Sequence, residues 1–142
     1  MIRELSKRYL AELVKLNLLS LKSLEKKIGK TDPHWIKEYF EYTFKEGKVF
    51  GYFIDGKLVG CVGYVLNPYG GSAEIQHVLV NPDFHRKGFG NELMDFIEKY
   101  IKENHPEIKE FRLSVLYGNR GALDFYRKNG YSKRSYIMKK KI

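Results

Sequence analysis

A short turn rich in glycine and basic residues has the composition and spacing needed to bind an anion. Residues 85–90 read His-Arg-Lys-Gly-Phe-Gly. The apolar run 73–80 before them predicts a strand, and the apolar spacing within 88–103 predicts a helix. A helix N-terminus offers unpaired N–H groups and the positive end of its dipole, and glycine lets a ligand approach the backbone. With the cations Arg86 and Lys87, these groups predict a pyrophosphate site.

This turn differs from two common nucleotide-binding motifs. A Walker A loop requires Gly-x-x-x-x-Gly-Lys-Ser/Thr, a pattern that the sequence does not contain. The dinucleotide fingerprint requires a third glycine at the position of Leu93. Because a lone Gly-x-Gly also occurs in ordinary loops, the prediction rests on its context: the strand before it, the basic pair and the helix after it.

The elements that must position the turn follow a mixed α/β pattern. Asp55-Gly56 joins two β-prone runs as a two-residue hairpin, and Asp32-Pro33 is typical of a helix start. The predicted order is β-α-α-β-β-β-α-β-α-β, a mostly antiparallel sheet with about four flanking helices and one β-α-β crossover. The predicted strands are 2–5, 49–54, 57–66, 73–80, 111–116 and 135–139; the helices follow Ser6 and Asp32, span 88–103 and follow Asn119.

Length and composition place the chain among globular domains. Its 142 residues show no repeat and no linker, so we expect a single domain over 1–142. The one cysteine, Cys61, is expected to be a buried small hydrophobe, and it excludes an intrachain disulfide and a cysteine-based zinc site. No histidine pair has metal-ligand spacing, so no metal is expected. The sequence has no apolar run long enough to span a bilayer and no signal-peptide pattern, so no membrane partner is expected, and the single cysteine predicts a reducing, cytoplasmic setting.

Two segments resemble motifs of the GNAT superfamily of N-acetyltransferases. His85-Arg86-Lys87-Gly88-Phe89-Gly90 is similar to the family's Gln/Arg-x-x-Gly-x-Gly/Ala, with histidine at the first position, where the family has a long donor. Residues 119–131 match Asn-x-x-Ala-x-x-Phe/Leu-Tyr-x-Lys-x-Gly-Phe/Tyr. Because the order of the predicted elements also resembles that of the family, the chain is identified as a member on two motifs in the correct order.

The resemblance implies that acetyl-CoA binds in a V-shaped opening between the strands 73–80 and 111–116. The backbone of Leu79 and Val80 would pair with the pantetheine amides, and Asn119 and Tyr126 would lie near the thioester. The turn would hold the pyrophosphate through its backbone N–H groups, with His85, Arg86, Lys87, Gly88, Phe89, Gly90 and Asn91 as the binding residues.

The chemistry of amine acetylation assigns two candidate catalytic roles. An alkyl ammonium with a pKa of about 10 must lose a proton before the amine can attack a thioester. By resemblance, Glu74 is the candidate base and Tyr126 the candidate acid for the leaving thiolate. Each residue also has a purely structural interpretation: Glu74 as a solvated carboxylate at a strand edge, and Tyr126 as a core aromatic. His77, on the opposite face of a regular strand, and water are the alternative bases.

The expected function is transfer of the acetyl group of acetyl-CoA to a primary amine of a small molecule, a peptide or a protein, by direct attack in a ternary complex. A CoA-binding or sensing module without turnover is the alternative. The net charge of +9 attracts polyanions, yet no nucleic-acid motif occurs, so no nucleic-acid partner is expected. The charge favours an acceptor amine with nearby acidic groups. The sequence leaves open longer acyl donors and a homodimer; the candidate acceptor-lining aromatics are Trp35, Tyr39, Tyr42, Tyr69 and Tyr117.

Overall fold

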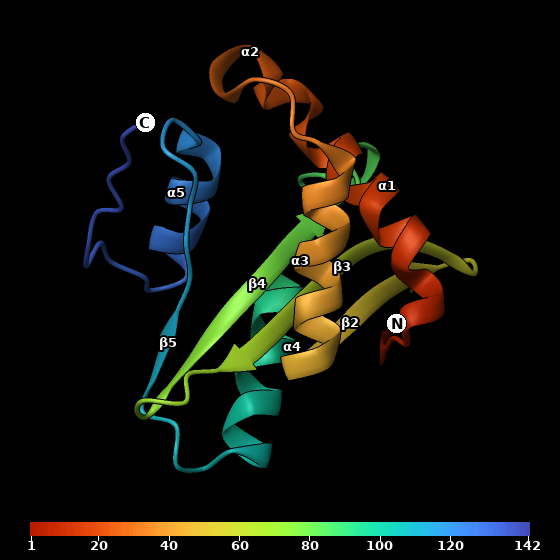
Figure 1. Cartoon of the computed structure of the whole chain (residues 1–142). Helices are drawn as coiled ribbons and strands as arrows, with labels where there is room; N and C mark the ends of the chain where they lie inside the picture. Colours follow the sequence, from red (N-terminus) through yellow and green to blue (C-terminus); the bar gives the residue numbers. More distant parts are fainter.

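Five strands form one mixed sheet in the order β1-β2-β3-β4-β5 (Figure 1). The structure is a computed structural model that describes the backbone of residues 1–142 and all side chains except that of residue 28. The first four strands are antiparallel, and β5 is parallel to β4, so α4 is the predicted crossover helix. The strands are β1 (Ile2–Glu4), β2 (Gly47–Ile54), β3 (Lys57–Leu66), β4 (Ser72–Val80) and β5 (Glu110–Arg112).

Helices cover both faces of the sheet (Figure 1), and the sheet separates the core into two clusters. On one face, α1 and α3 enclose a cluster around Leu13, Phe40 and Cys61. On the other face, α4 packs through Leu93 and Ile97, and α5 adds partly buried aromatic rings beside it. The helices are α1 (Leu10–Leu21), α2 (Glu25–Ile28), α3 (Pro33–Glu46), α4 (Phe89–Asn104) and α5 (Arg120–Lys128).

Local sequence signals account for most of these boundaries. The Asp32 side chain accepts a hydrogen bond from the His34 N–H at the start of α3, as an N-cap does. Asp55 and Gly56 have φ angles of 49° and 76°, as a type I′ hairpin turn requires. Together with the strand order and the one parallel pair, these boundaries confirm the predicted mixed α/β fold with its single crossover.

One predicted strand is shorter than expected and another is wrong. The strand predicted over 111–116 ends at Arg112, and residues 135–139 form no strand. Tyr136, Ile137 and Met138 are each more than 80 % exposed. A strand needs a partner edge and a buried face, and this segment has neither in the structure.

A β-bulge in β4 changes the faces predicted for its side chains. Cys61 pairs with Leu79 and Gly63 with Gln76, so Val62 alone opposes both His77 and Val78. His77 has a φ of 56°, in the left-handed region. The prediction that His77 lies on the face opposite Glu74 is therefore wrong. The bulge places His77 on the α3 side and moves Val78 to the α4 side.

The pairing of β5 stops early and leaves a V-shaped arrangement of strands (Figure 1). Only Ser72, Ala73 and Glu74 of β4 pair with β5. Beyond them the chain diverges from β4 toward α5. Within the described residues, the edge of β4 over 75–80 therefore has no neighbouring strand. None of the helices in the described part of the chain has the length and apolar composition to cross a membrane.

Candidate active site

The open edge of β4 ends at Val80, close to the glycine-containing turn. The Asn81 N–H donates to the Val59 carbonyl on β3, 2.7 Å away. Because backbone groups of successive residues point to opposite edges of a strand, the Val80 groups point to the open edge. The Val80 carbonyl lies 2.9 Å from His85 Nε2, which donates to it. Of the two predicted pantetheine partners, Val80 thus presents its backbone to the opening, and Leu79 pairs with Cys61 of β3.

The turn before α4 has the backbone geometry of an anion cradle. Arg86 and Gly88 have φ angles of 62° and 83°, and a Cβ on Gly88 would meet no atom within 4 Å. The first helical hydrogen bond runs from the Glu92 N–H to the Gly88 carbonyl, 3.1 Å. The N–H groups before Glu92 therefore have no acceptor inside the helix. Exposed cations flank them, so the turn fits a diphosphate.

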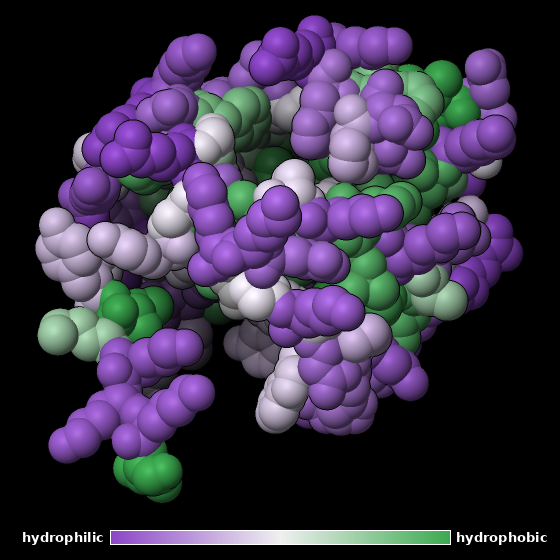
Figure 2. Space-filling view, turned by 90° about the horizontal axis from the view of Figure 1, so that it is seen from above, coloured by the Kyte–Doolittle hydropathy of each residue, from purple (hydrophilic) through white to green (hydrophobic). Residues whose placement is uncertain are grey.

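The second glycine of the motif has a packing role that the sequence did not suggest. A Cβ on Gly90 would lie 3.2 Å from the Phe125 ring of α5. The Asn129 Nδ2 also donates to Asn91 Oδ1, 3.1 Å away. These contacts hold α5 directly against the first turn of α4. From above, hydrophilic side chains surround a recess in which hydrophobic atoms are visible (Figure 2).

Helix α5 carries the other two predicted residues of the opening. Asn119 caps the helix, with its Oδ1 accepting from the Ala122 N–H at 3.1 Å. Tyr126 packs edge-on against Phe125 and Tyr131, at ring distances of 5.2 Å and 6.0 Å. Burial raises the pKa of Tyr126 to about 12, so its phenol stays protonated at neutral pH. The Tyr126 hydroxyl can therefore donate a proton or a hydrogen bond at neutral pH.

Glu74 stands at the closed end of the V and ends a chain of hydrogen bonds. Gln76 Nε2 donates to Glu74 Oε1, 3.2 Å away. The Thr43 hydroxyl of α3 lies 2.6 Å from Gln76 Oε1 and 2.9 Å from His77 Nε2. Because the Gln76 amide donates to the carboxylate, its Oε1 accepts from the Thr43 hydroxyl, which also lies 3.0 Å from the Tyr39 carbonyl. The His77 ring donates to Thr43. The orientation of Glu74 is therefore coupled to the bulge.

His77 is poorly suited to act as the base. It stacks on Phe40 at 3.9 Å, and its buried ring contacts Tyr39 at 4.3 Å. Burial lowers the pKa of His77 to about 3, despite the Tyr39 carbonyl, which raises it. A neutral imidazole with so low a pKa is a weak proton acceptor.

The predicted site residues lie on the two arms of the opening. Glu74 and Val80 belong to β4, whereas Asn119 and Tyr126 lie on the arm formed by β5 and α5 (Figure 1). Of the candidate aromatics, Trp35, Tyr39 and Tyr42 lie along one partly exposed face of α3, and Tyr69 and Tyr117 are almost fully exposed in loops.

Sequence reasoning missed the buried network of Thr43, Gln76 and His77. The available signal was three polar side chains within an apolar helix stripe and an apolar strand. Buried polar groups require partners, so three such residues suggest contacts with one another.

The described residues do not bring together three His, Cys, Asp or Glu side chains that could hold a metal ion.

Comparisons with known proteins agree on one family. The model described as "Acetyltransferase (GNAT) family" matches residues 16–131. An uncharacterized N-acetyltransferase of Methanocaldococcus jannaschii is 28 % identical over 144 residues, which cover 96 % of this chain and 62 % of that protein. The chain thus spans less than two thirds of this curated relative.

Solved structures show the same fold. A protein from Clostridium difficile 630, described as a possible acetyltransferase, has a TM-score of 0.76 at 25 % identity, covering 100 % of this chain and 96 % of its own. A PaiA N-acetyltransferase from Thermoplasma acidophilum, in complex with coenzyme A, has a TM-score of 0.77 at 23 % identity, covering 96 % of this chain and 92 % of its own.

The hydrogen-bond chain predicts a stability effect at Thr43. Thr43→Val keeps the shape but leaves the buried Gln76 carbonyl oxygen without its donor and removes the Thr43 contact of the His77 ring, so we expect a loss of about 2 kcal/mol in the free energy of unfolding. Thr43→Ser keeps the hydroxyl and is the control, with a smaller loss. Urea unfolding of both variants measures the difference. A valine variant as stable as the serine variant would contradict the network.

Proposed function

The chain belongs to the acetyltransferase (GNAT) family, and we therefore propose that it transfers the acetyl group of acetyl-CoA to a primary amine. The observation that carries this proposal is the meeting of an unpaired strand edge with a bare helix N-terminus. The edge of β4 ends at Val80, and the turn before α4 follows after a short 3₁₀ segment, Pro82–Phe84. One extended ligand with amides followed by a diphosphate satisfies both sets of backbone groups.

Acetyl-CoA supplies an activated acetyl thioester when it is bound. In the proposal, the Val80 backbone pairs with the pantetheine arm, and the N–H groups of residues 86–91 hold the diphosphate. His85 fixes the Val80 carbonyl at 2.9 Å, and Arg86 and Lys87 add charge. Asn119 borders the thioester end while its side chain caps α5.

Glu74 removes the ammonium proton of the acceptor in this proposal, directly or through a water molecule. A carboxylate suits the role because it is ionised at neutral pH, when an alkyl amine with a pKa of about 10 is almost fully protonated. Gln76 holds the carboxylate from one side, 3.2 Å away. The exposed face of α3 that carries Tyr39 borders the approach to it, since Tyr39 contacts His77 at 4.3 Å.

Tyr126 stabilises the leaving sulfur by donating a hydrogen bond to it. A thiol has a pKa of about 8.5, so moving a proton from a phenol with a pKa of about 12 to the thiolate is uphill by about 5 kcal/mol. A donated hydrogen bond to a developing charge carries no such cost and is worth a few kcal/mol. The hydrogen-bond role is therefore favoured over outright protonation by this side chain.

Direct attack of the amine in a ternary complex is favoured over a cysteine acyl-enzyme. Cys61 is fully buried in the α1 and α3 cluster, and its thiol donates to the His77 carbonyl at 3.2 Å. Burial raises the pKa of Cys61, which suppresses its thiolate. A buried thiol without an adjacent base is a poor nucleophile.

The role of Tyr126 is tested by Tyr126→Phe. We expect kcat to fall by about 10- to 100-fold, the value of one donor to a developing negative charge, with little change in the affinity for acetyl-CoA. Release of free thiol from acetyl-CoA across a panel of amines measures the rate, and calorimetric titration measures the affinity. An unchanged kcat would remove Tyr126 from the reaction. Stoichiometric binding without thiol release for every amine would instead support a sensing module.

The role of Glu74 is tested by the pH dependence of Glu74→Gln. Without a base, the rate follows the fraction of free amine, so kcat/KM should rise about tenfold for each pH unit below the pKa of the amine. The deficit relative to the parent protein should be largest at low pH and shrink as the pH rises. A deficit that is equal at every pH would make Glu74 a positioning contact and not the base.

A further inference from the structure

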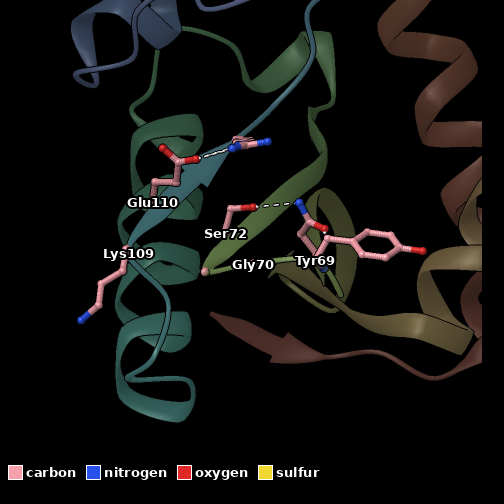
Figure 3. Close-up of a pocket in the computed structure, with 8 residues that line it drawn as sticks. Tyr69, Gly70, Ser72, Lys109 and Glu110 are labelled. Carbon is pink, nitrogen blue, oxygen red and sulfur yellow. Dashed lines mark hydrogen bonds and ion pairs between the residues drawn. The ribbon is translucent and has the colours of Figure 1, made fainter.

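A cavity lies at the closed end of the V, away from the proposed coenzyme turn. It measures about 510 Å³, within the usual size range of small-molecule sites. Its wall includes the start of β4, the loop before it and the strand β5 (Figure 3). Its lining residues are Asn67, Tyr69, Gly70, Gly71, Ser72, Lys109, Glu110 and Arg112.

This cavity opens on the same face of the sheet as Glu74. Ala73 and Phe111 belong to the core beneath α4, so their neighbours Ser72, Glu74 and Arg112 point to the opposite face. Arg112 is also the register partner of Glu74 across the β4–β5 pair. The cavity and the proposed base therefore lie on one surface of the sheet, and Arg112, which lines the cavity, is on the strand next to Glu74.

The cavity contains a guanidinium whose N–H donors are only partly used. The Arg112 Nε and Nη2 atoms both bind one oxygen of Glu110, at 2.8 Å and 2.6 Å. Within the described side chains no further partner of this guanidinium is found, and it has five N–H donors. The Arg112 side chain is 47 % exposed, whereas Lys109 points away from the cavity (Figure 3). Arg112 can therefore receive a second carboxylate beside that of Glu110.

Resting on the proposed function, we infer that this cavity holds a carboxylate of the acceptor, bound by Arg112, while the acceptor's amine lies at Glu74. Glu74 and Arg112 are register partners on neighbouring strands, whose backbones lie about 4.8 Å apart, so a small acceptor can carry its amine to one side chain and its carboxylate to the other. The acceptor class is thus a free amino acid or a dipeptide-sized amino acid derivative. The net charge of +9 attracts such an acid, whereas it repels polycationic amines.

Matched acceptors and two opposite variants test this assignment. Amino acids are offered as free acids and as carboxamides, and kcat/KM is measured by thiol release. Arg112→Gln should lower kcat/KM for the acids about tenfold and leave the carboxamides unchanged, because only the acids lose a charge-assisted hydrogen bond. Glu110→Gln frees the guanidinium from its competitor and should raise kcat/KM for the acids. A merely structural role of this ion pair would lower the rates on acids and carboxamides alike in both variants.

Lys99→Gln, on the exposed surface of α4, is the control for the loss of one positive charge and should leave the acid-to-carboxamide ratio unchanged. The KM for acetyl-CoA should stay constant in all three variants. Thiol release with no preference for acids, or with a preference that Arg112→Gln does not reduce, overturns the inference alone. Absence of thiol release for every amine overturns the proposed function and the inference with it.

Discussion

The site depends on one constraint: β4 is paired along both edges only as far as Glu74. Beyond that residue β5 leaves it, and the backbone groups on that edge must find other partners. Natural sheets protect such edges because an unpaired strand recruits other chains. Here the strand end is shielded by His85, which donates to the Val80 carbonyl, and by α5, which is fixed against α4 through Gly90 and Phe125. A ligand that pairs with the edge completes the sheet without distorting it.

The bulge in β4 connects this edge to Glu74, the proposed base. One extra residue turns His77 toward α3, where burial keeps its imidazole neutral and lets it donate to Thr43. Thr43 donates in turn to Gln76, and Gln76 donates to Glu74. This chain of polar side chains orients the Glu74 carboxylate at the vertex of the V. A left-handed φ at a residue other than glycine costs about 1–3 kcal/mol, and the stacking of His77 on Phe40 together with the hydrogen bonds offsets this strain. Rigidity at Glu74, the proposed base, thus comes from the core and not from the loops.

Much of the fold could be predicted because its signals are local. The Asp55-Gly56 turn, the Asp32 cap and the apolar stripe of α4 each follow from a few neighbouring residues. The bulge could not be predicted, because it depends on the packing of His77 against α3, a contact between segments far apart in sequence. For the same reason the sequence assigned a strand to 135–139, where propensity was present but a partner edge was not. The cavity beside Arg112 likewise arises only from the register of β5 against β4.

The most direct test of the central claim is amide hydrogen exchange of the protein with and without coenzyme A. Bound coenzyme should slow exchange at Val80 and across Phe89, Gly90 and Asn91, because these N–H groups would gain acceptors that neither the sheet nor the helix provides. The amides of Leu93 and Ile97, already bonded within α4, serve as the internal reference. Saturating coenzyme that leaves exchange at Val80 and the first turn of α4 unchanged would contradict the account.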